Sequence, residues 1–312
     1  MRARRLLAVA LASGTLLLGT ACAGNDVGSS GSGSGDKGSV TISGQNFPEA
    51  TLVASMYQQL LEKAGYSVTM KLVGTRDVYM KQFPGDVDIV PEYVAGIADF
   101  LNIRKNGADA KSITTSDPQE TLSALKPLAD AAKITMLQPA EATDANAFFV
   151  TKKFADQNSL KTLSDLGALN KPVVLAAAPD CEGRTDCAGG LSKAYGINIS
   201  KVLPLGYASA QTYESVLKGE SQVGETSTTD GSLASQGLVL LKDDKGIQPA
   251  QNLIPAVSTD FLKKHQDVES LLNGLMDKLT TDDLTTLNGT VGTDRQQPEV
   301  VAKQYLQDQG LL

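Results

Sequence analysis

Residues 39–73 read SVTISGQNFPEATLVASMYQQLLEKAGYSVTMKLV, and this stretch predicts a strand, a helix and a second strand. Residues 40–43 form the first predicted strand, and Pro48 opens the helix because proline is favoured at the first helical position. One apolar stripe then follows the helical period: Leu52, Val53, Met56, Leu60 and Leu61. Gly65 ends the helix, and residues 67–73 alternate between apolar and polar side chains, as in a half-buried strand.

The same order of strand and helix recurs along the rest of the chain. Further strands are predicted at residues 87–90, 134–137, 172–176, 201–205, 222–225, 238–241 and 253–257. Further helices are predicted at residues 77–83, after Tyr93, and at 118–132, 190–195, 212–218, 268–279, 282–287 and 298–309. Alternating strands and helices predict an α/β fold with mostly parallel sheets covered by helices on both faces.

Two such units followed by a helical tail predict two lobes. We expect residues 39–143 and 252–312 to form the first lobe and residues 144–251 the second. Ligands of open α/β folds bind outside the carboxyl ends of the strands, so a ligand cleft is expected between the lobes.

The amino terminus has the pattern of an export signal. Three arginines among the first five residues precede an apolar run at 6–18 that is too short to span a bilayer. Small residues and then Cys22 follow, which predicts a signal peptide at 1–21 and a lipid-modified Cys22. Ordinary cleavage near Ala21, which would leave a free cysteine, is the alternative.

Residues 22–38 are rich in glycine and serine, which is typical of a flexible tether. Seventeen residues of this kind give a mean reach of roughly 20–25 Å. Loss of residues 1–21 would remove three arginines and no acid, which changes the net charge from −7 to −10. The sequence therefore predicts an exported, acidic protein held near the outer face of the cytoplasmic membrane.

Composition excludes several kinds of function. The chain has fifteen aromatic residues, no tryptophan, and a single histidine, His265, which is expected at the surface. A net negative charge and few aromatics argue against a nucleic-acid partner. No nucleophile with an adjacent base and no set of metal ligands can be assembled, so neither an enzyme nor a metal or cofactor site is predicted.

Cys181 and Cys187 are the only cysteines after Cys22. In an exported protein, two cysteines six residues apart most simply form a disulfide, which here would rigidify the loop around Arg184. A metal site is the weaker alternative, because no histidine or second cysteine pair accompanies them.

Several short motifs occur in an order that is similar to that of a known family. They are GQNFPE at 44–49, DIVPEY at 88–93, a loop at 179–191 centred on Arg184, YESVLKG at 213–219 and TTDG at 228–231. With these motifs, residues 40–312 resemble the osmoprotectant-type (ProX/OpuC-like) substrate-binding proteins of ABC importers for glycine betaine, choline and carnitine. The resemblance implies a type II periplasmic-binding fold that acts as a monomer, without cofactor or catalysis, and delivers a solute to an ABC permease and its ATPase.

The resemblance also implies a set of ligand-binding residues. A quaternary ammonium is recognised by aromatic faces, each contact being worth roughly 0.5–2 kcal/mol, and a carboxylate by arginine or backbone N–H groups. The candidates are Gln45, Asn46, Thr75, Tyr93, Asn146, Arg184, Tyr207 and Ser227. Among them, Arg184 is expected to anchor a carboxylate or another polar group.

Two of these candidates depart from the family pattern. Asn146 and Ser227 stand where many members have aromatic residues, so a more hydroxylated or phenolic solute is an open alternative to a quaternary amine. A tethered sensor and a secreted enzyme on the same fold are the remaining alternatives.

Overall fold

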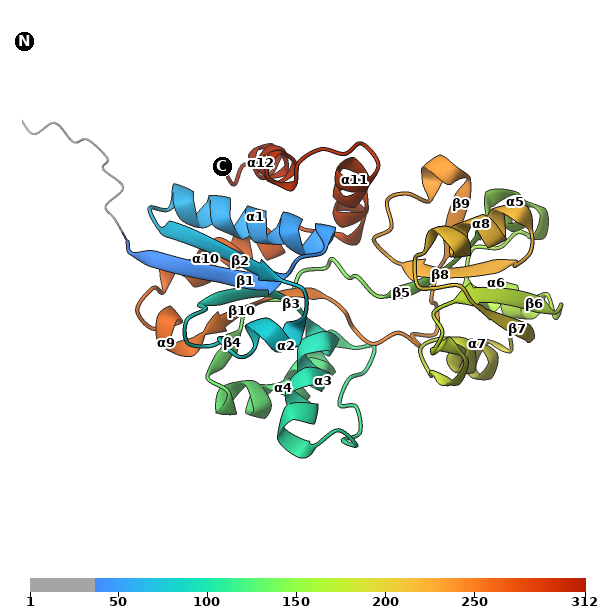
Figure 1. Ribbon diagram of the computed structural model, residues 1–312, viewed down its shortest axis with the longest axis horizontal. Coiled ribbons are helices and arrows are strands. Elements are labelled where there is room, and N and C mark those ends of the chain that lie inside the picture. The colour runs from blue at the N-terminus through green and yellow to red at the C-terminus, as the bar shows by residue number, and fades with distance from the viewer. Residues whose placement is uncertain (1–36) are drawn as a thin grey trace, which may run out of the picture. The chain divides into compact units, whose positions relative to one another are not determined.

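The computed structural model describes residues 37–312, which contain two five-stranded mixed sheets (Figure 1). The predicted signal segment, Cys22 and all but the last two residues of the predicted tether lie outside the described residues. The α/β architecture with two helix-covered sheets confirms the fold class expected from the sequence. The sheets are not mostly parallel, because each has two parallel and two antiparallel strand pairings.

The first sheet has the strand order β2-β1-β3-β10-β4. Its strands are β1 (Ser39–Gln45), β2 (Ser67–Val73), β3 (Ile89–Tyr93), β4 (Ile134–Met136) and β10 (Leu253–Ser258). Strand β1 is parallel to β2 and β3, whereas β10 inserts antiparallel between β3 and β4. The chain therefore returns to the first sheet only after it has completed the second.

The second sheet has the order β7-β6-β8-β5-β9. Its strands are β5 (Asn146–Thr151), β6 (Val173–Ala177), β7 (Ile199–Pro204), β8 (Val223–Ser227) and β9 (Leu238–Leu241). Strand β6 is parallel to β7 and β8, and β5 is antiparallel to β8 and β9. Asn146 and Ser227 are direct partners in the β5–β8 ladder, so the two departures from the family pattern lie side by side.

Helices cover both faces of the first sheet. They are α1 (Pro48–Lys63), α2 (Arg76–Tyr79), α3 (Val94–Asn106), α4 (Pro118–Ala131), α9 (Thr259–Leu262), α10 (Asp267–Met276), α11 (Thr281–Gly292) and α12 (Pro298–Asp308). Helices α1, α10, α11 and α12 pack into one apolar core, and α2, α3 and α4 into another on the opposite face (Figure 1). The apolar stripe of α1 is fully buried in the first of these cores, which is why that sequence folds as a helix.

The second sheet is covered in the same way by shorter helices. They are α5 (Lys152–Asn158), α6 (Leu163–Ala168), α7 (Ala188–Tyr195) and α8 (Ala210–Lys218), with two 3₁₀ turns at Cys181–Gly183 and Ala234–Gln236. Helices α5, α6 and α7 share one core, and α8 packs with Phe149 and Leu238 in another.

Two chain segments, residues 137–145 and 242–252, connect the sheets, and they pair with each other. Thr143 and Asn252 form an antiparallel bridge, and the Asp144 backbone N–H donates to the Gln251 carbonyl at 3.1 Å. A further contact joins α11 to the loop after β8, where the Asn288 side-chain amide donates to the Thr229 carbonyl at 3.2 Å. Within residues 37–312, no helix is both long and apolar enough to cross a bilayer.

Candidate functional site

A buried carboxylate lies next to Tyr93, the last residue of β3. Glu49, in the first turn of α1, is 4% exposed and accepts a hydrogen bond from the Tyr93 hydroxyl at 2.6 Å. Its second oxygen accepts from the Asn288 amide of α11 at 2.6 Å. The ring of Tyr93 also stacks on Phe47, with centroids 6.3 Å apart. Tyr93 is therefore held rigidly at the carboxyl end of the first sheet.

A second carboxylate, Asp144, extends this arrangement toward the second sheet. The Thr229 hydroxyl donates to Asp144 Oδ1 at 3.0 Å, and the Ser227 and Thr229 hydroxyls are 3.3 Å apart. The Ser227 hydroxyl and the charge of Asp144 both act on the phenol of Tyr207. Three of the predicted site residues, Tyr93, Tyr207 and Ser227, thus gather around Asp144.

The Glu49 charge acts on Asp144, and both charges act on Tyr93. Burial, and next the charge of Glu49, raise the pKa of Asp144 to about 7, against the lowering effect of the Thr229 and Ser227 hydroxyls. Burial and the Glu49 and Asp144 charges raise the pKa of Tyr93 well above its usual range. Desolvation raises the pKa of Tyr207 as well, although 44% of that residue's surface is exposed, because its hydroxyl end is the part withdrawn from water.

The raised pKa of Asp144 makes stability depend on pH. Between about pH 4 and pH 7 the folded protein keeps a proton on Asp144 that the unfolded chain has released, so this group's contribution to stability falls as pH rises through that range. Asp144→Asn removes the titration and keeps an acceptor for Thr229. We expect the variant to be more stable than the wild type by about 2 kcal/mol at pH 8, with the difference vanishing near pH 4.

Urea unfolding of both proteins at a series of pH values measures this difference. Asp156→Asn is the control, because Asp156 is exposed on α5 in an i,i+4 pair with Lys152. Parallel stability curves for wild type and Asp144→Asn would contradict the expected burial of this carboxylate.

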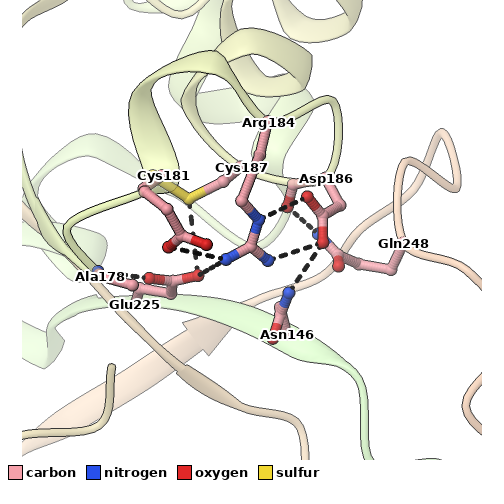
Figure 2. Close-up of a disulfide and its surroundings, with 9 residues drawn as sticks. Asn146, Ala178, Cys181, Arg184, Asp186, Cys187, Glu225 and Gln248 are labelled. Atoms are coloured by element: carbon pink, nitrogen blue, oxygen red, sulfur yellow. Dashed lines mark hydrogen bonds and ion pairs between the residues drawn. A yellow bond between two sulfur atoms is a disulfide. The ribbon is translucent and has the colours of Figure 1, made fainter. Parts of the chain in front are cut away.

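Arg184 lies in the loop between Cys181 and Cys187 and is surrounded by carboxylates (Figure 2). Its Nε and Nη2 atoms donate to the two oxygens of Asp186 at 2.9 and 2.7 Å, and Nη1 lies 3.4 Å from Asp180 and 4.0 Å from Glu225. The Asn146 amide donates to the same Asp186 carboxylate at 3.0 Å. Arg184 and Asn146, both predicted site residues, are thus joined through Asp186.

These contacts set the ionisation of the acids around Arg184. Although burial works against it, the Arg184 hydrogen bonds hold the pKa of Asp186 below its usual range. Glu225 is fully buried, and burial raises its pKa despite the hydrogen bond from the Ala178 backbone N–H and the charge of Arg184. Arg184 therefore acts in this structure as the counterion of the protein's own carboxylates.

The predicted disulfide between Cys181 and Cys187 is confirmed, and both cysteines are buried in the core of the second sheet. The cysteine sulfurs and Glu225 lie within 4.8 Å of one another. Because both sulfurs belong to the disulfide, they are not available as thiolate ligands for a metal ion.

Removing the disulfide is expected to lower stability, because the unfolded chain would gain conformational freedom. A loop of this length contributes about 2 kcal/mol, so replacing both Cys181 and Cys187 by alanine should lower the free energy of unfolding by roughly that amount. Urea unfolding with and without a reducing agent provides the control. Reductant should bring the wild type close to the variant and leave the variant unchanged, whereas equal stability of the oxidised wild type and the variant would contradict this expectation.

The other three predicted residues lie at the edge of the first sheet. Gln45 is the last residue of β1 and is half-buried, and Asn46 follows it in an exposed position. Thr75 is exposed and immediately precedes α2. All three share the carboxyl edge of the parallel strands with Tyr93, as expected for this class of sheet.

A cavity of about 650 Å³ runs along the segments that connect the sheets. Its lining includes Asn146, Lys161, Gln248 and Asn252, but none of the other seven predicted site residues. The Oε1 atom of Gln248 is buried there without a hydrogen-bond partner among the described residues. The lining of this cavity does not include Asp144, Tyr93 or Tyr207.

Four members of the candidate site, Glu49, Asp144, Asp186 and Asn288, were not singled out from the sequence, whereas Thr229 was interpreted as a residue that caps a helix or hydrogen-bonds a ligand. Glu49 lies within the GQNFPE motif, and Thr229 lies in TTDG, so the motifs carried a signal for these two. Asp186 is two residues from Arg184, a spacing that places a carboxylate within reach of a loop arginine. Asp144 and Asn288 carried no local signal, because only the folded chain brings them to Tyr93 and Thr229.

Comparisons with known proteins show the family to which the chain belongs. Residues 38–308 match the family described as the substrate binding domain of ABC-type glycine betaine transport system. The chain is 26% identical over 281 residues to a glycine-betaine-binding protein of Pseudomonas aeruginosa, covering 87% of this chain and 88% of the relative. It is also 26% identical over 284 residues to the carnitine transport binding protein OpuCC of Listeria monocytogenes, covering 89% of each chain.

A solved structure of apo YehZ from Escherichia coli is similar as well. It has a TM-score of 0.73 at 25% identity, over 88% of this chain and 99% of that one. The match to the family model covers nearly the whole described chain. The chain belongs to the family of substrate-binding domains of ABC-type glycine betaine transport systems, as a solute-binding component that works with an ABC permease and its ATPase and not as an enzyme.

Proposed function

We propose that this protein captures a small osmoprotectant-like solute, such as glycine betaine, choline or carnitine, between two lobes and delivers it to its permease. The first lobe is formed by residues 39–143 and 252–312, and the second by residues 144–251. The observation that supports the proposal is that the Asp144 charge acts on both Tyr93 and Tyr207, which belong to the two different lobes proposed here. Two tyrosines beside a carboxylate suit a quaternary ammonium group.

The remaining candidate residues extend this proposed site. Gln45, Asn46 and Thr75 border it on the first lobe, and Asn146, Arg184 and Ser227 on the second. The polar side chains of Asn146 and Ser227, which face each other across β5 and β8, favour a solute with hydroxyl groups as the second candidate. We further propose that the exported chain is a monomer, anchored by lipid on Cys22 and tethered by residues 22–38.

Isothermal calorimetry of the purified protein with glycine betaine, choline and carnitine tests the proposed function. We expect micromolar or tighter binding of at least one of them. Tyr207→Ala should weaken that binding by roughly 3- to 30-fold, whereas Tyr207→Phe, which keeps the ring, should stay within about 3-fold of the wild type. Tyr305→Phe, on α12, is the control for loss of a tyrosine hydroxyl elsewhere.

Failure of all three solutes to bind would contradict the quaternary-amine proposal and favour the hydroxylated alternative, which sugars, polyols and phenols would then test in the same assay. Equal binding by the wild type and Tyr207→Ala would remove Tyr207 from the site.

A further inference from the structure

We propose that the solute carries a net positive charge and no carboxylate group, as a quaternary ammonium alcohol does, and that Glu49 and Asp144 determine this preference. The inference rests on the proposed function and narrows it, because betaines and carnitine are zwitterions with a carboxylate. It follows from two features of the described residues. The arginines near the site are paired with carboxylates of the protein itself, and Glu49 and Asp144, beside the tyrosines, have no cationic partner.

The arginine expected to hold a carboxylate is already engaged. Arg184 presents the bidentate face formed by Nε and Nη2, which is the face that best matches a carboxylate, to Asp186. Asp186 is itself fixed by the Asn146 amide, and its backbone carbonyl accepts from the Gln248 amide at 2.7 Å (Figure 2). A solute carboxylate would have to displace this internal partner and leave Asp186 beside Glu225 without its counterion.

The second arginine near the site is engaged in the same way. Arg76, which follows Thr75, donates from Nε and Nη2 to the two oxygens of Glu92, each at 2.9 Å. Glu92 is 1% exposed, so this pair is internal to the first lobe. Of the arginines in residues 37–312, Arg104 donates to the Met80 carbonyl and Arg295 lies after α11, in the turn before α12. The described chain therefore offers a carboxylate solute no arginine that is free of an internal partner beside the site.

Unlike the arginines, the carboxylates beside the tyrosines, Glu49 and Asp144, have no ion-pair partner among residues 37–312. Glu49 accepts hydrogen bonds from the neutral groups of Tyr93 and Asn288, and Asp144 from the hydroxyl of Thr229. Among residues 37–312, no lysine or arginine forms an ion pair with either of them within 4.0 Å. Glu49 is buried and Asp144 is half-buried. Two such carboxylates without a counterion create a negative potential, which a cation would neutralise and an anionic group would oppose.

The surroundings of Asp144 also favour its protonated form. Burial and Glu49 raise the pKa of Asp144 to about 7, so at neutral pH a proton partly takes the place of a counterion. The ionisable groups that face Asp144 are Glu49 from α1, Tyr93 from β3 and Tyr207 from the loop after β7. None of them is cationic. A bound cation would therefore favour the ionised form of Asp144, and its affinity should rise as pH increases through 7.

Calorimetric titration of the wild type with choline and with glycine betaine at pH 8 tests the inference without any variant. The two probes share the trimethylammonium group and differ in the carboxylate. We expect choline to bind at least about tenfold more tightly than glycine betaine. Choline affinity should also rise by a few-fold from pH 6 to pH 8.

Asp144→Asn identifies the residue responsible. This variant should lose roughly tenfold in choline affinity at pH 8, lose the pH dependence, and change its glycine betaine affinity much less. Glu49→Gln is the second variant, since it keeps the acceptor for Tyr93. Asp156→Asn removes the same charge from an exposed position on α5 and should bind choline as the wild type does.

The outcomes separate this inference from the proposed function. Equal or tighter binding of glycine betaine would overturn the inference and leave the proposed function in place. Choline selectivity that survives in both Asp144→Asn and Glu49→Gln would overturn the role given to these carboxylates. Failure of choline, glycine betaine and carnitine alike to bind would overturn the proposed function itself, and the inference with it.

Discussion

Replacing Arg76 by methionine is expected to lower the free energy of unfolding by about 3 kcal/mol, because the change leaves a buried carboxylate without its counterion. Glu92 is 1% exposed and is held by Arg76, by the Tyr79 hydroxyl and by the Tyr93 backbone N–H. The guanidinium also packs over Gly96, where no side chain intervenes. Urea unfolding at pH 7 measures the loss.

The partner substitution provides the internal control for this prediction. Adding Glu92→Gln to Arg76→Met removes the uncompensated charge while keeping the bonds from Tyr79 and Tyr93, so the double variant should recover at least half of the lost stability. Lys126→Ala breaks an exposed i,i+4 pair with Asp130 and should change stability by less than about 0.5 kcal/mol. If Arg76→Met lowered the free energy of unfolding as little as Lys126→Ala, the prediction that buried Glu92 requires the Arg76 counterion would be wrong.

Gly231→Ala is expected to weaken solute binding at least about tenfold and to lower stability by about 2 kcal/mol. A Cβ atom at residue 231 would lie 2.3 Å from the Thr285 carbonyl oxygen and 2.4 Å from the Gly289 backbone nitrogen of α11. Because these are backbone atoms of a helix, the loop after β8 would have to move. Thr229 and Ser227 lie in and just before that loop, so the hydroxyls at Asp144 would move with it.

Gly292→Ala is the matched control for this change. Gly292 ends α11, and a Cβ atom there meets nothing within 4 Å, so the variant should keep full stability or gain slightly from the helix propensity of alanine. Calorimetry with choline and thermal unfolding of both variants make the comparison. Unchanged affinity in Gly231→Ala would contradict the importance of the contact between the loop and α11.

Much of the fold follows from local patterns that the chain itself carries. The stripe of α1, the proline at its start and the alternation in β2 each arise from neighbouring residues, so the first strand–helix–strand unit was predictable. The insertion of β10 between β3 and β4 was not, because strand order depends on contacts between residues more than one hundred positions apart. His265, expected at the surface, is half-buried and stacks on Phe261.

In the candidate site, too, residues within motifs were predictable, and residues that only the folded chain brings together were not. Motifs indicated Tyr93, Arg184 and Ser227 as candidates. The structure connects Tyr93 to Ser227 through Glu49, Asn288 and Thr229. The carboxylates of this network are Glu49, from α1, and Asp144, from a segment that connects the sheets. Acidic residues are so common in the sequence that nothing distinguished these two. The partner of Arg184 also depends on the loop conformation that the disulfide closes.

A crystal structure of the protein with choline tests the location of the solute site most directly. We expect the trimethylammonium group within about 6 Å of the ring centroids of Tyr93 and Tyr207, facing the Asp144 carboxylate, with the Arg184–Asp186 pair intact. Choline bound instead in the cavity beside Gln248 and Lys161, or beside Arg184 with that pair broken, would contradict the assignment of the site.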